Sequence, residues 1–395
     1  MPPISVEADK IQGDSMATEV KEYDGATDKG LEGVVACTTK ISSIVGNTLT
    51  YRGFTIDELA EHSTFEEVIF LLWNDRLPKR EELEELRAEL IANMRLSSET
   101  VGLMKQLPVK TAVPMDFLRT MVSALSMQDV DSKDISAQAN HRKAMRLTGI
   151  IGAIVAGFYR FREGKEIVQP DPAKNIAWNF LHMMNGEKPD ELVAKMFDTC
   201  LILHADHELN CSAFSARVTT SSLSDMHSAI TSAIGTLKGP LHGGANEQVM
   251  KMLLHIGSLE ATKKFIEDAL NNKAKVMGIG HRVYKNGDPR AKILRKMSEQ
   301  LTTKTGQRHF YEMSIAIDDI MQEKKDLLPN VDFYSATVYY CMGIPIDLYT
   351  PIFAVSRVSG WIAHVLEQIE NNRIYRPRGH YTGRHDQKWV PLEKR

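Results

Sequence analysis

The chain has 395 residues, 43% of them apolar, which is enough for a substantial buried core in one large domain or two. Its formal net charge is only −3, so no basic excess marks nucleic acid as the main partner. Four scattered cysteines without a C-x-x-C pair argue against a disulfide framework or a zinc site, and they fit a reducing, cytoplasmic compartment.

The N-terminal part of the chain combines an acidic segment with the clearest strand signal. Residues 1–29 are rich in Asp and Glu and have no apolar run, which predicts a flexible acidic tail rather than a signal or transit peptide. Residues 39–52 alternate β-branched and polar side chains around Val45-Gly46-Asn47-Thr48. This pattern predicts a small β-hairpin, nearly the only strand structure in the chain.

The remainder has helical periodicity, so the predicted fold class is mainly α. Thr64 and Glu67 have the spacing of a capping box that opens a helix running to Trp73. The most apolar run, 147–159, is shorter than the roughly 20 residues that span a bilayer, which predicts a buried core helix and no membrane partner. Further helices are predicted over 83–94, 117–127, 144–161, 175–184, 191–210, 225–237, 247–256, 262–271, 289–301, 335–342 and 351–370.

Proline and glycine cluster at 239–244, 278–289 and 343–351. Because no repeat period and no low-complexity linker is present, a second domain is expected to be inserted between the first and last of these clusters. The predicted organisation is an acidic tail over 1–29, a large helical domain made of 30–238 and 343–395, and a small helical domain over 239–342. Such a small domain is expected to close over a substrate.

Three short motifs each place one proton-transfer side chain in a constrained stretch of backbone. His242 lies in Gly-Pro-Leu-His-Gly-Gly, His281 in Gly-Ile-Gly-His-Arg, and Asp332 in Pro-Asn-Val-Asp. Together they suggest two uncharged histidines and a carboxylate for acid–base chemistry on a carbon acid. The alternative is structural: His242 as a turn residue, His281 bonded to the main chain, and Asp332 as a helix N-cap.

Arginines close to these motifs give the second signal. Arg290, Arg357 and Arg376 have few obvious acidic neighbours, and Arg357 falls within an apolar helix. A buried guanidinium needs an anionic partner, which suggests a small dicarboxylate ligand held by bidentate contacts. Internal ion pairs or surface side chains remain the alternative for each arginine.

Two other sites stay open at this stage. His204-Ala205-Asp206-His207 resembles the metal-binding pattern of some hydrolases, with both histidines on one helix face, although no further ligands complete a metal shell. The loop at 276–281 with Lys285 and Lys325 could hold a nucleotide phosphate, although Gly-x-Gly alone is a weak motif.

With these residues assembled, the chain resembles the citrate synthase family from residue 30 to residue 378. The resemblance is carried by long blocks: His204-Ala205-Asp206-His207-Glu208-Leu209-Asn210, Gly239-Pro240-Leu241-His242-Gly243-Gly244-Ala245-Asn246-Glu247, Gly278-Ile279-Gly280-His281-Arg282-Val283-Tyr284, Asn330-Val331-Asp332-Phe333-Tyr334-Ser335-Ala336 and Phe353-Ala354-Val355-Ser356-Arg357.

The resemblance implies a two-domain helical homodimer that condenses acetyl-CoA, as co-substrate, with oxaloacetate, and needs no permanently bound cofactor. It implies that Asp332 removes a methyl proton, that His242 hydrogen-bonds the thioester oxygen, and that His281 polarises the oxaloacetate carbonyl. It also implies that oxaloacetate is held by His207, Arg290, Arg357 and, from the second subunit, Arg376. Contacts to coenzyme A are expected from Gly278, Gly280, Lys285 and Lys325.

Three alternatives to this function remain. A 2-methylcitrate synthase would use propionyl-CoA with the same machinery, and the motifs do not separate the two substrates. A metal-dependent hydrolase would be built on His204, Asp206 and His207. A non-catalytic relative is expected to lack one of the three proton-transfer residues, yet all three are present.

Overall fold

The only sheet among the described residues of the computed structural model, 29–31 and 33–395, is small and antiparallel. Its strands are β1 (Ser42–Val45), β2 (Thr48–Tyr51) and β3 (Phe54–Thr55). Ser42 pairs with Tyr51 and Val45 with Thr48, which confirms the predicted hairpin and its turn. The strand β3, which has two residues and pairs with the end of β2, was not predicted.

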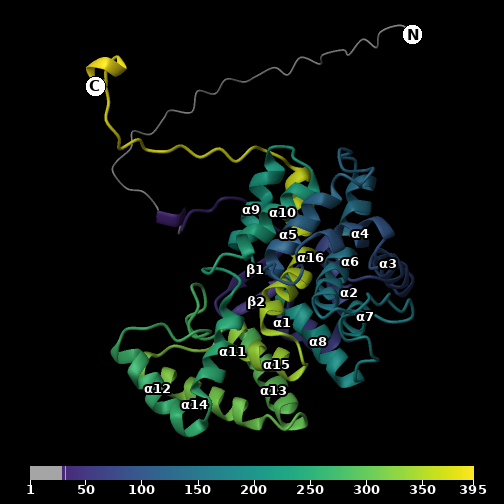
Figure 1. The fold of residues 1–395 in the computed structure, drawn as a ribbon, viewed down its shortest axis with the longest axis vertical. Helices are drawn as coiled ribbons and strands as arrows, with labels where there is room; N and C mark the ends of the chain where they lie inside the picture. The colour runs from purple at the N-terminus through teal and green to yellow at the C-terminus, as the bar shows by residue number, and fades with distance from the viewer. Residues whose placement is uncertain (1–28, 32) are drawn as a thin grey trace. The chain divides into compact units, whose positions relative to one another are not determined.

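Helices make up most of the remaining described structure, which confirms the mainly α class (Figure 1). The predicted capping box is present: the Thr64 hydroxyl accepts from the Glu67 amide, and the Glu67 carboxylate accepts from the Thr64 amide. The helices before the site are α1 (Ile56–His62), α2 (Phe65–Asn74), α3 (Arg80–Asn93), α4 (Ser98–Gln106), α5 (Pro114–Leu125), α6 (Ala137–Arg162), α7 (Ile176–Asn185), α8 (Glu191–His204), α9 (Cys211–Ser221) and α10 (Met226–Leu237).

One prediction in this part is wrong. The helix expected over 191–210 ends at His204, and α9 begins at Cys211. The Asn210 side chain accepts from the Ala213 amide and so caps a new helix. Residues 205–210 therefore form a connecting segment between two helices.

Helix α6 is apolar along most of its length. By length and composition it is the one helix in the described part of the chain that could cross a membrane, but 72% of its most apolar window is buried inside the protein. It therefore forms part of the core, as predicted for 147–159.

The helices that follow α10 pack mainly on one another and are grouped at the lower end of Figure 1. They are α11 (Ala245–Ile256), α12 (Leu259–Asn271), α13 (Pro289–Lys304), α14 (Arg308–Lys325) and α15 (Val331–Cys341). The last long helix, α16 (Tyr349–Glu370), contacts α2, α5, α6, α8, α9, α10 and α11.

The chain divides into two compact units. Residues 39–375 form the larger one, which contains the sheet and every helix from α1 to α16. The other is described for residues 29–31, 33–38 and 376–395, and contains the short 3-10 helices η1 (Lys29–Leu31) and η3 (Leu392–Lys394). The acidic tail predicted over 1–29 lies, apart from Lys29, outside the described residues.

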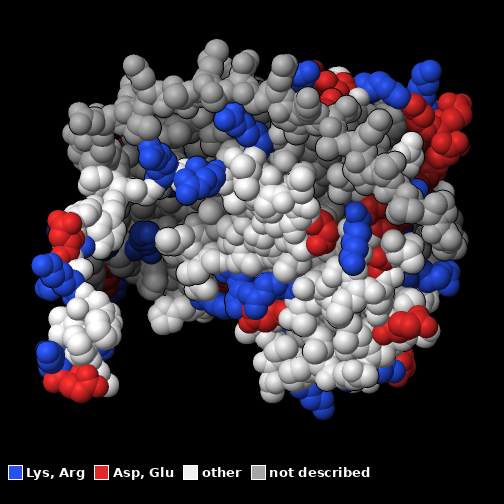
Figure 2. Space-filling model, turned by 90° about the horizontal axis from the view of Figure 1, so that it is seen from above, with Lys and Arg blue, Asp and Glu red and all other residues white. Residues whose placement is uncertain are grey.

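Charged side chains of both signs are interspersed over the described surface drawn in Figure 2. This distribution agrees with the small net charge of the chain.

Candidate active site

His242 lies between α10 and α11, where the chain turns back on itself. The backbone amide of Ser212, in the first turn of α9, donates to its Nε2 at 3.2 Å, and the Ser212 hydroxyl lies 2.8 Å from the same nitrogen. Because an amide can only donate, Nε2 is the acceptor and the proton of the neutral ring is on Nδ1. Burial, with a smaller effect of Arg357, lowers the pKa of His242 to about 4. His242 is thus a neutral donor through Nδ1 at pH 7.

His281 has the opposite tautomer. The backbone amides of Val283 and Tyr284 donate to its Nδ1 at 3.0 and 3.2 Å. The proton of the neutral ring is therefore on Nε2. Burial, followed by the charge of Arg290, lowers the pKa of His281 to about 4. The structural alternative, a histidine hydrogen-bonded to the main chain, is correct for Nδ1 of His281. It leaves Nε2 as a hydrogen-bond donor.

The loop that carries His281 is joined to the segment before α15 by main-chain bonds. Ile279 and Pro329 form an antiparallel bridge, and the Asn330 amide donates to the Gly278 carbonyl at 2.9 Å. Gly278 has φ +75°, and a Cβ there would come within 3.0 Å of Phe333, so only glycine fits. This pairing places the His281 and Asp332 segments side by side.

Asp332 is in the first turn of α15, but it is not the N-cap. Asn330 takes that role, since its side chain accepts from the Asp332 amide at 3.0 Å. The Oδ1 atom of Asp332 is buried and has no hydrogen-bond partner among the described residues. Burial raises the pKa of Asp332 to about 7, against the lowering effect of Arg290. A carboxylate with these properties is suited to take up a proton near neutral pH.

The two buried arginines differ in their partners. Arg290 makes an internal ion pair, with Nη2 2.7 Å and Nε 2.9 Å from the Asp288 carboxylate. Arg357 donates from Nε to the His204 carbonyl at 2.7 Å and lies over the Phe353 ring, and no carboxylate of the described residues is within ion-pair distance. Burial lowers the pKa of Arg357 to about 10. Arg357 is therefore the buried cation that most needs an anionic ligand.

His207 lies next to Tyr284 and His281 and within the electrostatic influence of Arg290 and Arg357. Its Nε2 is 3.1 Å from the Tyr284 hydroxyl, and its ring centroid is 5.1 Å from that of His281. Burial and the charges of Arg290 and Arg357 hold its pKa well below the ordinary value. The same two arginines also act on the pKa of Asp332, so all these side chains share one electrostatic environment.

The metal-hydrolase pattern does not converge in space. His204 ends α8 and its Nδ1 faces the Cys200 carbonyl at 2.7 Å, while Asp206 lies against Ser42 and His364. His207 lies beyond the helix and faces Tyr284, so the expectation that both histidines share a helix face is wrong. In the described part of the chain no three His, Cys, Asp or Glu side chains are grouped to hold a metal ion.

The remaining predicted residues lie at the surface or in loops. Lys285, Lys325 and Arg376 are exposed, and Arg376 is in the other compact unit. The amide of Gly280 donates to the Leu328 carbonyl at 2.8 Å, so this amide shapes the loop rather than facing outward.

Sequence reasoning missed several residues that support the site. Asp288, two positions before Arg290, is its ion-pair partner, and that short spacing was the available signal. The Ser212 amide and the Tyr284 hydroxyl had no comparable signal, because their roles depend on contacts between distant segments.

Comparison with known proteins gives the family. Residues 30–378 match the model described as "Citrate synthase, C-terminal domain". The chain belongs to the citrate synthase family. It is 53% identical over 367 residues to "Citrate synthase 2" of Bacillus subtilis, covering 93% of this chain and 99% of that protein. It is also 40% identical over 381 residues to "2-methylcitrate synthase 1" of Corynebacterium glutamicum, covering 94% and 99%.

Solved structures agree with the fold. Citrate synthase from Pyrobaculum aerophilum has a TM-score of 0.88 at 41% identity, covering 98% of this chain and 100% of that one. A ternary complex of the Thermoplasma acidophilum citrate synthase with carboxymethyl coenzyme A and oxaloacetate has a TM-score of 0.88 at 32% identity, covering 93% and 99%. The predicted citrate synthase fold is thereby confirmed, and the chain is a citrate synthase, the enzyme that condenses acetyl-CoA with oxaloacetate.

Proposed function

We propose that this citrate synthase uses Asp332 as general base and His242 and His281 as neutral hydrogen-bond donors. Asp332 removes a proton from the methyl group of acetyl-CoA, while Nδ1–H of His242 stabilises the developing enol oxygen. Nε2–H of His281 polarises the oxaloacetate carbonyl and protonates it as the carbon–carbon bond forms. Water then hydrolyses the citryl thioester to citrate and CoA.

One observation carries this proposal. In each of the two histidines, one ring nitrogen accepts a hydrogen bond from the backbone. The other ring nitrogen therefore carries the proton and can donate a hydrogen bond while the ring stays neutral. A neutral donor does not compete with Asp332 for the substrate proton, because both histidines have a pKa near 4 and Asp332 has one near 7.

Oxaloacetate is expected to bind at the buried arginines. Arg357 supplies a cation without a carboxylate partner, Arg290 is held by Asp288, and His207 adds a donor beside them. The enzyme is proposed to work as a homodimer in which Arg376 of the partner subunit completes the dicarboxylate site.

Coenzyme A is expected along the exposed edge of the helical segment 239–342. Lys285 and Lys325 are exposed there, and Gly278 and Gly280 give the neighbouring loop its shape. We propose that 239–342 is a small domain that closes on 30–238 and 343–395, since an enol must be protected from water. Four free cysteines fit a cytoplasmic location for the enzyme.

Replacing the base tests the assignment directly. Asp332→Asn is expected to bind oxaloacetate with an affinity within about threefold of the parent, but to lower the rate of thiol release by roughly 10²–10⁴-fold. Oxaloacetate binding is measured by calorimetry and turnover by free-thiol formation. A folded variant that turns over normally would remove Asp332 as the base.

The acyl preference needs its own measurement, because a relative named 2-methylcitrate synthase shares 40% identity. We expect acetyl-CoA to be preferred over propionyl-CoA. The extra methylene is worth roughly 1–3 kcal/mol, or about 10- to 200-fold in kcat/KM. Thiol release with each thioester at saturating oxaloacetate measures the ratio, and a ratio favouring propionyl-CoA would make the enzyme a 2-methylcitrate synthase.

A further inference from the structure

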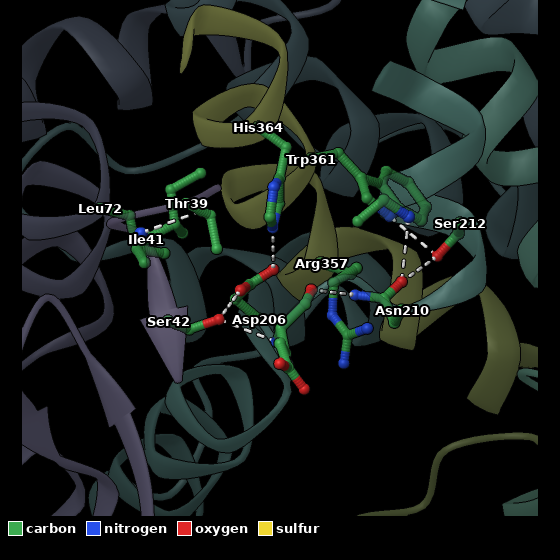
Figure 3. Close-up of polar contacts among 12 residues, drawn as sticks. Thr39, Ile41, Ser42, Leu72, Asp206, Asn210, Ser212, Arg357, Trp361 and His364 are labelled. Carbon is green, nitrogen blue, oxygen red and sulfur yellow. Dashed lines mark hydrogen bonds and ion pairs between the residues drawn. The ribbon is translucent and has the colours of Figure 1, made fainter. Parts of the chain in front are cut away.

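A buried polar network lies directly behind the proposed oxaloacetate site. It consists of Ser42, Asp206, Arg217, His364 and Glu367, and we refer to it as the Asp206 network. Asp206 and His364 have no solvent exposure, and Arg217 is 2% exposed. Figure 3 shows His364 reaching from α16 to one side of Asp206 while Ser42 of β1 approaches the other. None of these five residues has a role in the chemistry proposed above.

The tautomer of His364 is fixed by its neighbour. Arg217 Nε donates to His364 Nδ1 at 2.9 Å, and Arg217 also pairs with Glu367. Nδ1 is therefore the acceptor, and the ring proton is on Nε2, which is 3.3 Å from Asp206 Oδ1. His364 Nε2 thus lies within ion-pair distance of the Asp206 carboxylate, and neither Nε2 nor Oδ1 has a hydrogen-bond partner among the described residues.

The other contacts of Asp206 fasten the segment that carries His207. Ser42 donates its hydroxyl proton to Asp206 Oδ2 and accepts from the Glu208 amide at 2.8 Å. The Tyr51 hydroxyl donates to the Asp206 carbonyl at 2.8 Å. The residues before and after His207 are thereby both tied to the sheet, which restricts where its imidazole can lie.

The same segment also holds Arg357. The His204 carbonyl, at its start, accepts from Arg357 Nε at 2.7 Å. Burial lowers the pKa of Arg357, and the negative charge of Asp206 opposes this more than any other charge does. Close packing with α16 requires a glycine, because a Cβ at Gly360 would be 2.3 Å from the Ala205 carbonyl and 2.6 Å from Asp206 Oδ1. Asp206 is therefore linked to His207 and Arg357, two of the side chains proposed to hold the dicarboxylate.

We propose that Asp206 and His364 are positioning residues that set His207 and Arg357 for oxaloacetate and supply the buried negative charge that balances Arg357 when the site is empty. This inference rests on the proposed oxaloacetate site. It assigns a specific consequence to the pair: loss of the contact weakens oxaloacetate binding, whereas the acid–base groups and the coenzyme A contacts keep their geometry.

A matched pair of variants at His364 tests the contact. His364→Asn keeps an acceptor near the Nδ1 position for Arg217 but is too short to reach Asp206. His364→Gln places an amide N–H near the Nε2 position. We expect His364→Asn to raise the KM and Kd for oxaloacetate by about tenfold or more, with kcat and the KM for acetyl-CoA within about threefold, and His364→Gln to recover most of the affinity.

Asp206→Asn provides a second, independent variant in case His364→Asn does not fold. It keeps the shape of the side chain and removes the charge, and it is expected to raise the oxaloacetate Kd by about tenfold with the KM for acetyl-CoA unchanged. Circular dichroism and the melting temperature check that each variant is folded. Folded variants with parental oxaloacetate affinity, or with equal losses in kcat and in both KM values, would overturn the inference.

Arg357→Gln separates this inference from the proposed function. If Arg357→Gln binds oxaloacetate as tightly as the parent, the proposed oxaloacetate site is wrong and the inference falls with it. If Arg357→Gln loses affinity while the folded His364→Asn and Asp206→Asn variants do not, the site stands and only the positioning role is wrong.

Discussion

At the scale of single residues, the role of each histidine is decided by which ring nitrogen the backbone or a neighbour occupies. His242 is held at Nε2 and His281 at Nδ1, so two residues of the same type present donors from different nitrogens. The sequence identified both histidines through their glycine-rich surroundings. It could not supply the tautomers, because the amide that fixes the ring of His242, that of Ser212, comes from a helix about 30 residues away.

The raised pKa of Asp332 predicts the acid limb of the pH profile. The proposed base must be ionised to accept a proton, so kcat/KM is expected to fall as the pH drops through about 7, with a slope approaching one on a logarithmic plot. His242 and His281, each with a pKa of about 4, stay neutral above that pH and therefore add no further change to the pH profile there.

Initial rates of thiol release between pH 5 and 9 measure this profile. Oxaloacetate binding over the same range is the control that separates substrate affinity from the ionisation of the base. A profile that is flat from pH 5 to 9 would contradict the raised pKa of Asp332.

At the scale of elements, local signals succeeded where the deciding contacts are close in sequence. The capping box at Thr64 and the hairpin turn at Gly46-Asn47 depend only on neighbouring residues, and both are present. The break between α8 and α9 was missed because the apolar pattern continues beyond His204, while the contacts that bend the chain come from Ser42 and Tyr51 in the distant sheet.

A buried acid pair joins three of these elements. Glu66, in the first turn of α2, accepts from the Ile176 amide at the start of α7 at 2.7 Å, and Asp198 of α8 accepts from the Phe65 amide at 3.2 Å. Burial raises the pKa of Glu66, and burial together with Glu66 raises that of Asp198. The folded protein therefore holds protons on these carboxyl groups that the unfolded chain releases. The stability that this pair contributes is lost as the pH rises above about 4, the ordinary pKa of Asp and Glu in an unfolded chain.

Glu66→Gln is expected to stabilise the enzyme at pH 8, because it removes the cost of a buried carboxylate whose pKa is raised. Its amide oxygen can still accept from Ile176. The difference should shrink as the pH is lowered from 8 to 5, because protonation of Glu66, whose pKa is raised, removes the buried charge. Denaturant unfolding at both pH values measures it, with the exposed Glu61→Gln as a control expected to change little. A Glu66→Gln variant that is less stable at pH 8 would refute this account.

At the scale of the whole molecule, composition and periodicity were enough to predict the mainly helical class. Whether one chain contains every residue of the proposed active site depends instead on how the subunits assemble. Residues 39–375 contain His207, His242, His281, Arg290, Asp332 and Arg357, whereas Arg376 begins the other compact unit. The sequence resemblance implies that Arg376 acts in the partner subunit of a homodimer. A test of that expectation must therefore distinguish action in the same chain from action across the dimer.

Mixing two inactive variants makes that distinction. In a heterodimer of Arg376→Gln and Asp332→Asn, action across the dimer gives one site with both native residues and one site with neither, whereas action within one chain leaves every site defective. Random reassociation of equal amounts makes about half of the dimers mixed, with one of two sites restored, so about a quarter of the parental activity is expected.

The two variants are unfolded together, refolded and assayed by thiol release, with each variant refolded alone as the control. Because neither homodimer contains a complete site, any recovered activity must come from mixed dimers. Recovery near a quarter of the parental value assigns Arg376 to the site of the other subunit. If the mixture remains as inactive as the separate variants, while an affinity tag carried by only one variant co-purifies the other and so shows that mixed dimers have formed, Arg376 acts within its own chain.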